Sequence, residues 1–212
     1  MSPVTHHIPD DIIEAYASGA LPHAFAVVVA THLSLCDTCR AMAEACDALA
    51  GTALDALDGP AADAALRART LAMLDEPLRK SAPIGAPQGI YPGAVIAELG
   101  GGKPRWSNLG AGIRQQILSS GAEGSVRLLY IPGGKAVPDH GHNGLEMTLV
   151  LQGSFHDQTG QYGRGDVQVV ADEIEHTPIA DVGPACICLA ATDAPLRFNA
   201  LIPRLLQGIF KI

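Results

Sequence analysis

The sequence predicts a chain in two parts, α-helices first and β-strands second. Between residues 10 and 74, apolar residues recur three and four positions apart, which is the helical spacing. From Trp106 onward, short apolar or alternating runs are separated by Gly-rich or Asp/Pro turns, which is typical of strands. We therefore predict a small helical domain over residues 1–80, a linker over 81–105 and an all-β domain over 106–212.

Local start and stop signals predict four helices in the first part. Asp10 and Asp11 can cap the first helix, and the second begins at Pro22, a residue that suits the first turn. The third is expected from about Asp37 to a stop at Gly51, and the fourth over residues 61–74. The linker that follows contains five prolines and six glycines between positions 77 and 104, with one short strand expected over residues 94–99.

Six strands are predicted in the second part. Their even spacing is typical of an antiparallel barrel or sandwich. They are expected at residues 113–118, 126–131, 146–152, 167–170, 185–191 and 196–201. The last residues, 203–210, are predicted to form a terminal helix or an extended arm.

Charge is distributed unevenly between the two parts. The chain carries a net charge of −8, and residues 1–80 alone contain 11 acidic and 5 basic residues, a balance of −6. Phosphates would repel such a surface, so we expect no direct nucleic-acid binding. An acidic domain can instead suit a basic protein surface, including one that itself binds DNA.

Composition also bears on the compartment. No apolar run approaches the roughly 20 residues that a membrane-spanning helix needs, and no secretory signal pattern opens the chain. Five cysteines, an odd number and unevenly spread, argue against a disulfide framework and favour metal or thiol chemistry. We expect a cytoplasmic protein that does not associate with a membrane.

The first candidate site is a histidine four residues before a Cys-x-x-Cys pair. His32, Cys36 and Cys39 lie at helical positions 0, 4 and 7, which share a face. Two thiolates and an imidazole are ligands that zinc takes, and His6 or His7 can supply the fourth. The alternative, a thioredoxin-like redox motif, would require a strand before the helix, and that context is missing.

The second candidate site lies in the β-domain. His140 and His142 are two apart on a strand and therefore point to the same side, Glu146 follows on the next strand, and His176 comes about thirty residues later. Three imidazoles and a carboxylate suit zinc, iron(II), manganese or nickel. With four protein ligands, both a closed zinc site and an open iron site are consistent with the sequence.

This second set resembles the cupin family. The first cupin motif, Gly-x5-His-x-His-x3-Glu-x6-Gly, is matched at Gly134, His140, His142, Glu146 and Gly153. The second motif is matched at Gly165 and His176, but Ala171, Glu173 and Ala180 stand where Pro, Gly and Asn are expected. The resemblance implies a C-terminal cupin barrel with a metal held by the three histidines and Glu146.

The first set resembles zinc-binding anti-sigma domains, with His7 as the preferred N-terminal ligand and His6 in reserve. With a zinc anti-sigma domain followed by a cupin, this chain resembles the ChrR-type anti-sigma factors over nearly its whole length. The resemblance implies a regulator, not an enzyme. It would bind and inhibit an extracytoplasmic-function sigma factor through the helical domain, and release it when the cupin domain senses singlet oxygen or related oxidative stress.

A thiol pair is a candidate for the sensing step. Cys186 and Cys188 are two apart on a predicted strand, so their side chains face the same side and can point into the barrel. A disulfide between them would be strained, which favours sulfenic acid chemistry. The alternative is that both are small apolar strand residues.

Two other functions remain open from the residues alone. A cupin dioxygenase or isomerase with an accessory zinc module would turn over a small substrate, and a storage or structural protein would have neither activity nor partner. Substitution of His32 or Cys36 separates the first two possibilities, because only an anti-sigma factor would lose a protein partner.

Overall fold

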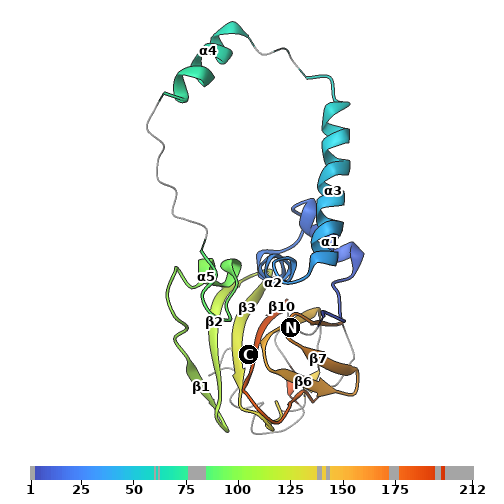
Figure 1. Cartoon of the computed structure of the whole chain (residues 1–212), viewed down its shortest axis with the longest axis vertical. Helices are drawn as coiled ribbons and strands as arrows, with labels where there is room; N and C mark the ends of the chain where they lie inside the picture. The colour runs from blue at the N-terminus through green and yellow to red at the C-terminus, as the bar shows by residue number, and fades with distance from the viewer. Residues whose placement is uncertain are drawn as a thin grey trace.

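The structure is a computed structural model that describes residues 3–59, 61, 63–75, 85–137, 140–141, 144–171, 177–193 and 197–198, without the side chains of the two short segments 140–141 and 197–198. Helices lie at one end of the molecule and strands at the other (Figure 1). The described helices are α1 (Asp10–Ala17), α2 (His23–Leu33), α3 (Asp37–Asp55), α4 (Ala64–Met73) and α5 (Gly93–Glu98).

The four helices predicted in the first part are present. Pro9 and Pro22 stand directly before α1 and α2, and the break between them includes Gly19, whose φ of +72° suits glycine. The prediction that α3 stops at Gly51 is wrong, since the helix continues to Asp55. A single glycine costs a helix only about 1 kcal/mol, too little to end it here.

The strand predicted over residues 94–99 is also wrong. This segment forms α5, which follows Pro92 and buries Val95 and Ile96. Six mostly apolar residues carry no clear period, so the sequence alone does not separate a short strand from a short helix. The predicted linker therefore contains a helix that packs against α2.

Each of the six predicted strands overlaps a strand of the structure, two of them with the predicted bounds, 146–152 and 167–170. The described strands are β1 (Ser107–Gly110), β2 (Ile113–Gly121), β3 (Gly124–Ile131), β4 (His140–Gly141), β5 (Glu146–Gln152), β6 (Ser154–Asp157), β7 (Gly160–Gly163), β8 (Val167–Val170), β9 (Ile179–Ala180), β10 (Cys186–Thr192) and β11 (Arg197–Phe198). Five of these, β1, β4, β6, β7 and β9, were not predicted. Of the strand predicted over 196–201 only β11 is described, and the predicted terminal element at 203–210 lies outside the described residues.

The described strands form three antiparallel sheets and do not close into the barrel that the sequence predicted. The largest has the order β1-β2-β3-β10-β5-β8; the others are β7-β6-β9 and the pair β11-β4. Because side chains alternate between faces, the large sheet has an outer face toward α2 and an inner face toward β6 and β7.

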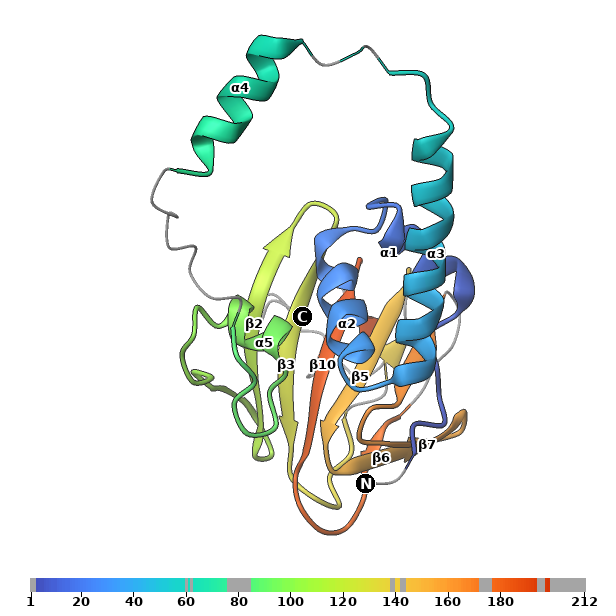
Figure 2. The same cartoon turned by 45° about the horizontal axis from the view of Figure 1, so that its top comes forward.

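Helix α2 lies across the outer face of the large sheet, over β3, β10 and β5 (Figure 2). Its apolar residues surround the helix rather than forming one stripe, and seven of its eleven residues are buried. Phe25 and Val28 belong to one continuous core with Leu128 and Leu189 of the sheet. The helical part and the β-part therefore share a core, with roughly 1.5–3 kcal/mol from each large apolar side chain buried there.

The apolar character of α2 also bears on membrane association. Among the described residues, no single helix is long and apolar enough to cross a membrane. Taken together, α2 and α3 have the length and composition of a membrane span, but the pair is bent by 117°. The burial of α2 against the sheet accounts for its apolar residues.

Candidate metal centre

The segment between α2 and α3 places three of the predicted ligands together. His32 lies in the last turn of α2, and its carbonyl oxygen accepts hydrogen bonds from the amides of Leu35 and Cys36 at 2.8 and 2.9 Å. This tight turn lets α3 start at once, with Cys36 in an extended conformation just before it and Cys39 in its first turn. The predicted spacing thus holds although a turn interrupts the helix.

A fourth donor comes from the N-terminal arm, which we define as residues 3–9. His7 Nδ1 lies 3.3 Å from Cys36 Sγ and 3.5 Å from Cys39 Sγ. One ligand atom from each of His7, His32, Cys36 and Cys39 lies within 4.8 Å of the others. Tetrahedral zinc, with bonds of about 2.0–2.3 Å, requires ligand separations of roughly 3.3–3.8 Å, and the two distances from His7 to the thiols fall in that range.

The His32 ring is oriented as a metal ligand would be. It is fully buried, and its Nδ1 lies 2.9 Å from the carbonyl oxygen of Gly165, an acceptor that assigns the ring proton to Nδ1. The other nitrogen, Nε2, is buried and has no hydrogen-bond partner in the structure. Burial lowers the pKa of His32, so the ring is neutral and offers the Nε2 lone pair to an ion.

The two thiols of the cluster are each only 3% exposed. Burial raises the pKa of Cys39 to about 11, so without a cation this group is a neutral thiol. A divalent cation would supply the charge that stabilises thiolates in this setting. The orphaned Nε2 atom, two thiols and a second imidazole together fit zinc.

His6, the alternative N-terminal ligand, lies elsewhere. Its backbone N–H donates to Asp166 Oδ1 at 2.9 Å, and its ring centroid is 4.4 Å from that of Tyr162. Of the two neighbouring histidines, the structure brings His7 to the thiols and holds His6 against the β-part.

Of the second predicted site, the structure describes one side chain. Glu146 begins β5, is 8% exposed and accepts a hydrogen bond from Thr148 on the inner face. His142 and His176 lie outside the described residues, and of His140 only the backbone in β4 is described.

Arg127 is a residue that the sequence reasoning missed. It is 6% exposed on the inner face, where its guanidinium donates to Ser125 and Gln115 and interacts with the charge of Glu146. Burial lowers the pKa of Arg127, while the Glu146 charge opposes that shift. A lone basic residue inside the strand sequence Gly-Ser-Val-Arg-Leu-Leu was the available signal.

The predicted thiol pair lies on the same inner face. Cys186 and Cys188 are both buried, and their Sγ atoms are 3.4 Å apart. The hydrogen bond with Cys186, together with burial, raises the pKa of Cys188, and the charge of Glu146 adds to the shift. The thiol of Cys188 is therefore protonated in this setting.

Comparisons with known proteins agree with these motifs. Residues 101–194 match the family described as the ChrR cupin-like domain. A curated protein, the anti-sigma-E factor ChrR of Cereibacter sphaeroides, is 49% identical over 99% of this chain and 99% of its own length. An anti-sigma factor is a regulator rather than an enzyme.

Solved structures give the same result. A crystal structure of Rhodobacter sphaeroides SigE in complex with the anti-sigma ChrR matches 90% of this chain and 99% of that chain, with 48% identity and a TM-score of 0.77. An RmlC-like cupin from Ralstonia eutropha JMP134 matches 46% of this chain and 68% of its own, at 20% identity and a TM-score of 0.42. Because it is 49% identical to the anti-sigma-E factor ChrR over 99% of both chains, this chain belongs to the ChrR family of anti-sigma factors.

Proposed function

We propose that this protein binds an extracytoplasmic-function sigma factor through its helical part and thereby inhibits it, in the cytoplasm. The observation that carries the proposal is a set of exposed apolar side chains. They lie on the outer half of α3, on α4, and in the residues that directly follow each of these helices. Leu49, Leu54 and Leu57 are each about 70% exposed, and α4 buries none of its residues. We call this set the apolar arm: Leu49, Leu54, Leu57, Leu66, Leu71, Met73 and Leu74.

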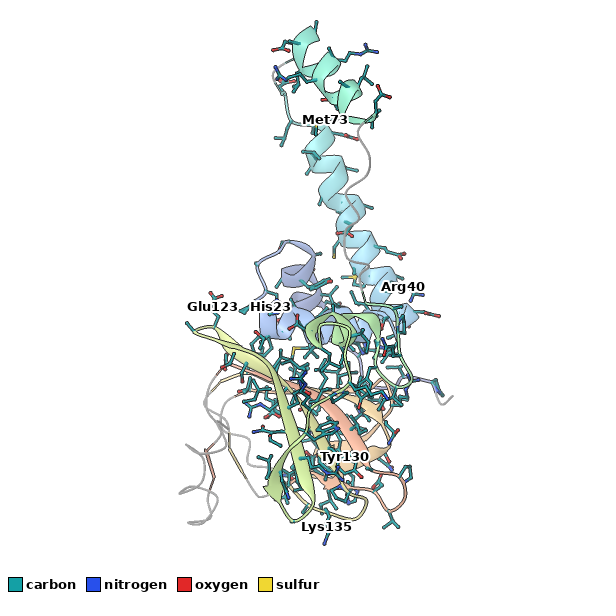
Figure 3. All side chains as sticks on the ribbon, turned by 90° about the vertical axis from the view of Figure 1, so that its left-hand side faces the viewer. His23, Arg40, Met73, Glu123, Tyr130 and Lys135 are labelled. Atoms are coloured by element: carbon teal, nitrogen blue, oxygen red, sulfur yellow. The ribbon has the colours of Figure 1, made fainter. Side chains whose placement is uncertain are left out.

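The apolar arm stands away from the sheet (Figure 1), and Met73 lies at the end of the molecule opposite to Lys135 (Figure 3). Large apolar side chains gathered on an exposed surface mark an interaction site, because water solvates them poorly. The surrounding charge of −6 over residues 1–80 suits a partner with a basic, DNA-facing surface. The relative of known structure was crystallised with a sigma factor.

The division of labour that we propose follows the sequence boundaries. Residues 1–80 hold the partner, 81–105 connect, and 106–212 receive the signal. Zinc bound by His7, His32, Cys36 and Cys39 would cross-link the N-terminal arm, α2 and α3, and so add its binding free energy to the folded state of the helical part.

We further propose that the cupin-like β-part responds to singlet oxygen or related oxidative stress. His140, His142, Glu146 and His176 would hold its metal, which is zinc, iron, manganese or nickel. Support comes from the buried carboxylate of Glu146, which lies on the same face as the thiols of Cys186 and Cys188. These thiols are the candidates for oxidation to sulfenic acid.

The test is an affinity purification of the full-length tagged protein from its native host, with mass spectrometry and metal analysis. Recovery of a near-stoichiometric sigma factor with about two metal equivalents is the expected result. Two variants sharpen it: Cys36→Ser should lose the sigma factor, whereas Glu146→Gln should keep it and lose the response to oxidant. Loss of sigma binding in the Glu146 variant would contradict this division of labour.

A further inference from the structure

The turn between β7 and β8 makes several hydrogen bonds with the N-terminal arm. Asp166 Oδ1 accepts hydrogen bonds from the backbone amides of Thr5 and His6, at 2.7 and 2.9 Å. The amide of Val167 donates in turn to the carbonyl oxygen of His6, at 3.2 Å. The arm is therefore hydrogen-bonded to a turn about 160 residues away in sequence, immediately before His7.

The same turn also holds His32. The carbonyl oxygen of Gly165 accepts the Nδ1–H of that ring at 2.9 Å, in a buried position. Two neighbouring residues of the β-part thus fix two of the four donor groups: Asp166 through the backbone next to His7, and Gly165 through the ring of His32. The four donor residues all come from the helical part, but much of what orients them does not.

Gly165 also permits the arm to approach closely. Its φ is +96°, and a Cβ atom built there would lie 2.7 Å from Val4 Cγ2. Any side chain at this position would strain the turn and push against the arm.

The turn is in backbone contact with β5. The amide of Gly165 donates to the carbonyl oxygen of Val150 at 2.9 Å, and the amide of Val150 donates to that of Asp166 at 3.1 Å. Strand β5 begins at Glu146, the described residue of the second predicted site. One strand therefore joins that site to the turn.

We propose that Asp166 is a positioning residue of the metal centre: it holds the N-terminal arm so that His7 reaches the thiols, and the β-part thereby sets the metal affinity of the helical part. This inference rests on the proposed zinc site. It names a route by which a change in the β-part weakens the helical part. A shift of the turn releases the backbone beside His7 and removes one ligand before any thiol is altered.

The first experiment compares the zinc affinity of full-length wild type and Asp166→Asn, measured by competition with a chromophoric chelator. Asn has one accepting oxygen in place of two, and its NH₂ group accepts no hydrogen bond, so it cannot serve both the arm amides and the amide of Gly163, which now donates to Oδ2 at 2.8 Å. We expect zinc to bind about 10–100-fold more weakly, as is typical when the partner of a ligand is lost. The control is Asp181→Asn, a carboxylate bonded to Ser154 and His156 away from the arm, which should bind zinc as wild type does.

A second measurement separates positioning from a general loss of stability. If Asp166 acts through His7, the double variant His7→Ala/Asp166→Asn should bind zinc no more weakly than His7→Ala alone. Cobalt(II) in place of zinc should give both single variants the same altered absorption spectrum, since both lose the same ligand. Affinity of Asp166→Asn within twofold of wild type, or fully additive losses, would overturn the proposal.

A variant on the arm side covers the case in which the Asp166 variant does not fold. Thr5→Pro removes both Thr5 donors to Asp166 and leaves every β-part side chain unchanged, so it should weaken zinc binding in the same way. Gly165→Ala should weaken it too, whereas Gly183→Ala, with φ of +138° but open space around it, should not. Sigma binding measured at saturating zinc is independent of these results, so a failure of either proposal can be told from a failure of the other.

Discussion

The two halves of α3 differ in what covers them. The first turns carry Cys39 and Ala43, which are buried against α1, α2 and the N-terminal arm. The outer half carries Leu49 and Leu54, which no part of the described chain covers. One helix thus begins inside the protein's own core and ends as an exposed apolar surface.

A binding surface can thus be held in place by a buried segment of the same helix. The base of α3 is held by groups that are distant in sequence, the arm and the β7–β8 turn, and by the four donor groups. The outer half makes none of these contacts, and it depends on the base for its direction. Conditions that disrupt the base should therefore disable the outer half without touching it.

Removing a thiol at the base should have the largest effect. Cys36→Ser leaves a hydroxyl that zinc binds poorly, so we expect zinc affinity to fall more than about 100-fold and sigma binding to be lost with it. Zinc is measured by chelator competition and sigma binding by size-exclusion chromatography. Cys46→Ser, in α3 beyond the metal centre, is the matched control and should change neither. Retained sigma binding by a zinc-free Cys36 variant would show that the outer half does not need the base.

Lowering the pH should have the next-largest effect on the metal centre at the start of α3. Because the pKa of Cys39 is raised to about 11, this thiol gives up its proton when zinc binds at neutral pH. Because zinc binding releases this one proton, zinc affinity should fall about tenfold for each pH unit below 8. The pKa of His32 is lowered, so this ring stays neutral near pH 7 and adds nothing there. Chelator competition at pH 8, 7 and 6 measures the slope; a flat profile would exclude Cys39 as a thiolate ligand.

Charging the outer half should have a smaller and more selective effect. Leu54→Glu places a charge on a residue that is 68% exposed, so the melting temperature and zinc affinity should not change. Sigma binding, measured by calorimetry, should weaken about tenfold if this side chain is buried in the complex. Val182→Glu, at a site 95% exposed on the β-part, is the control. Equal affinity of both variants for the sigma factor would remove Leu54 from the interface.

The thiol pair of the β-part should matter least for binding itself. Replacing Cys186 and Cys188 by Ser should change sigma affinity less than about twofold without oxidant, because both lie on the inner face away from α2. Release under singlet oxygen should be lost. The measurement is sigma-dependent transcription with and without a photosensitiser; unchanged release would remove these thiols from the mechanism.

Much of this arrangement could be predicted from local patterns. The alternating run from Glu146 to Gln152 predicted β5 with its bounds, and the spacing of His32, Cys36 and Cys39 predicted a shared face. Both depend on residues close in sequence, whose geometry the backbone fixes.

The remainder depends on contacts that are distant in sequence. His6 and His7 are chemically identical neighbours. Their different positions depend on Asp166, about 160 residues away, which accepts a hydrogen bond from the backbone of His6. The apolar residues all round α2 indicated burial, but nothing in them named the sheet as the partner. Likewise α5 was mistaken for a strand because six residues are too few to show a period.

The position of α2 has a consequence for how the apolar arm is presented. The chain leaves the base of α3 beside α2 and returns at α5, which also packs on α2. His23 of α2 and Glu98 of α5 are in contact, with Nε2 and Oε1 3.1 Å apart. The apolar arm is thus part of a closed loop rather than a free tail (Figure 1). Part of the conformational entropy that a free tail would lose on binding is already lost in folding, since closing a loop restricts the chain between its ends. Opening the loop at either attachment would add that entropy cost to binding. Loss of either attachment should therefore weaken partner binding, although neither is part of the interface.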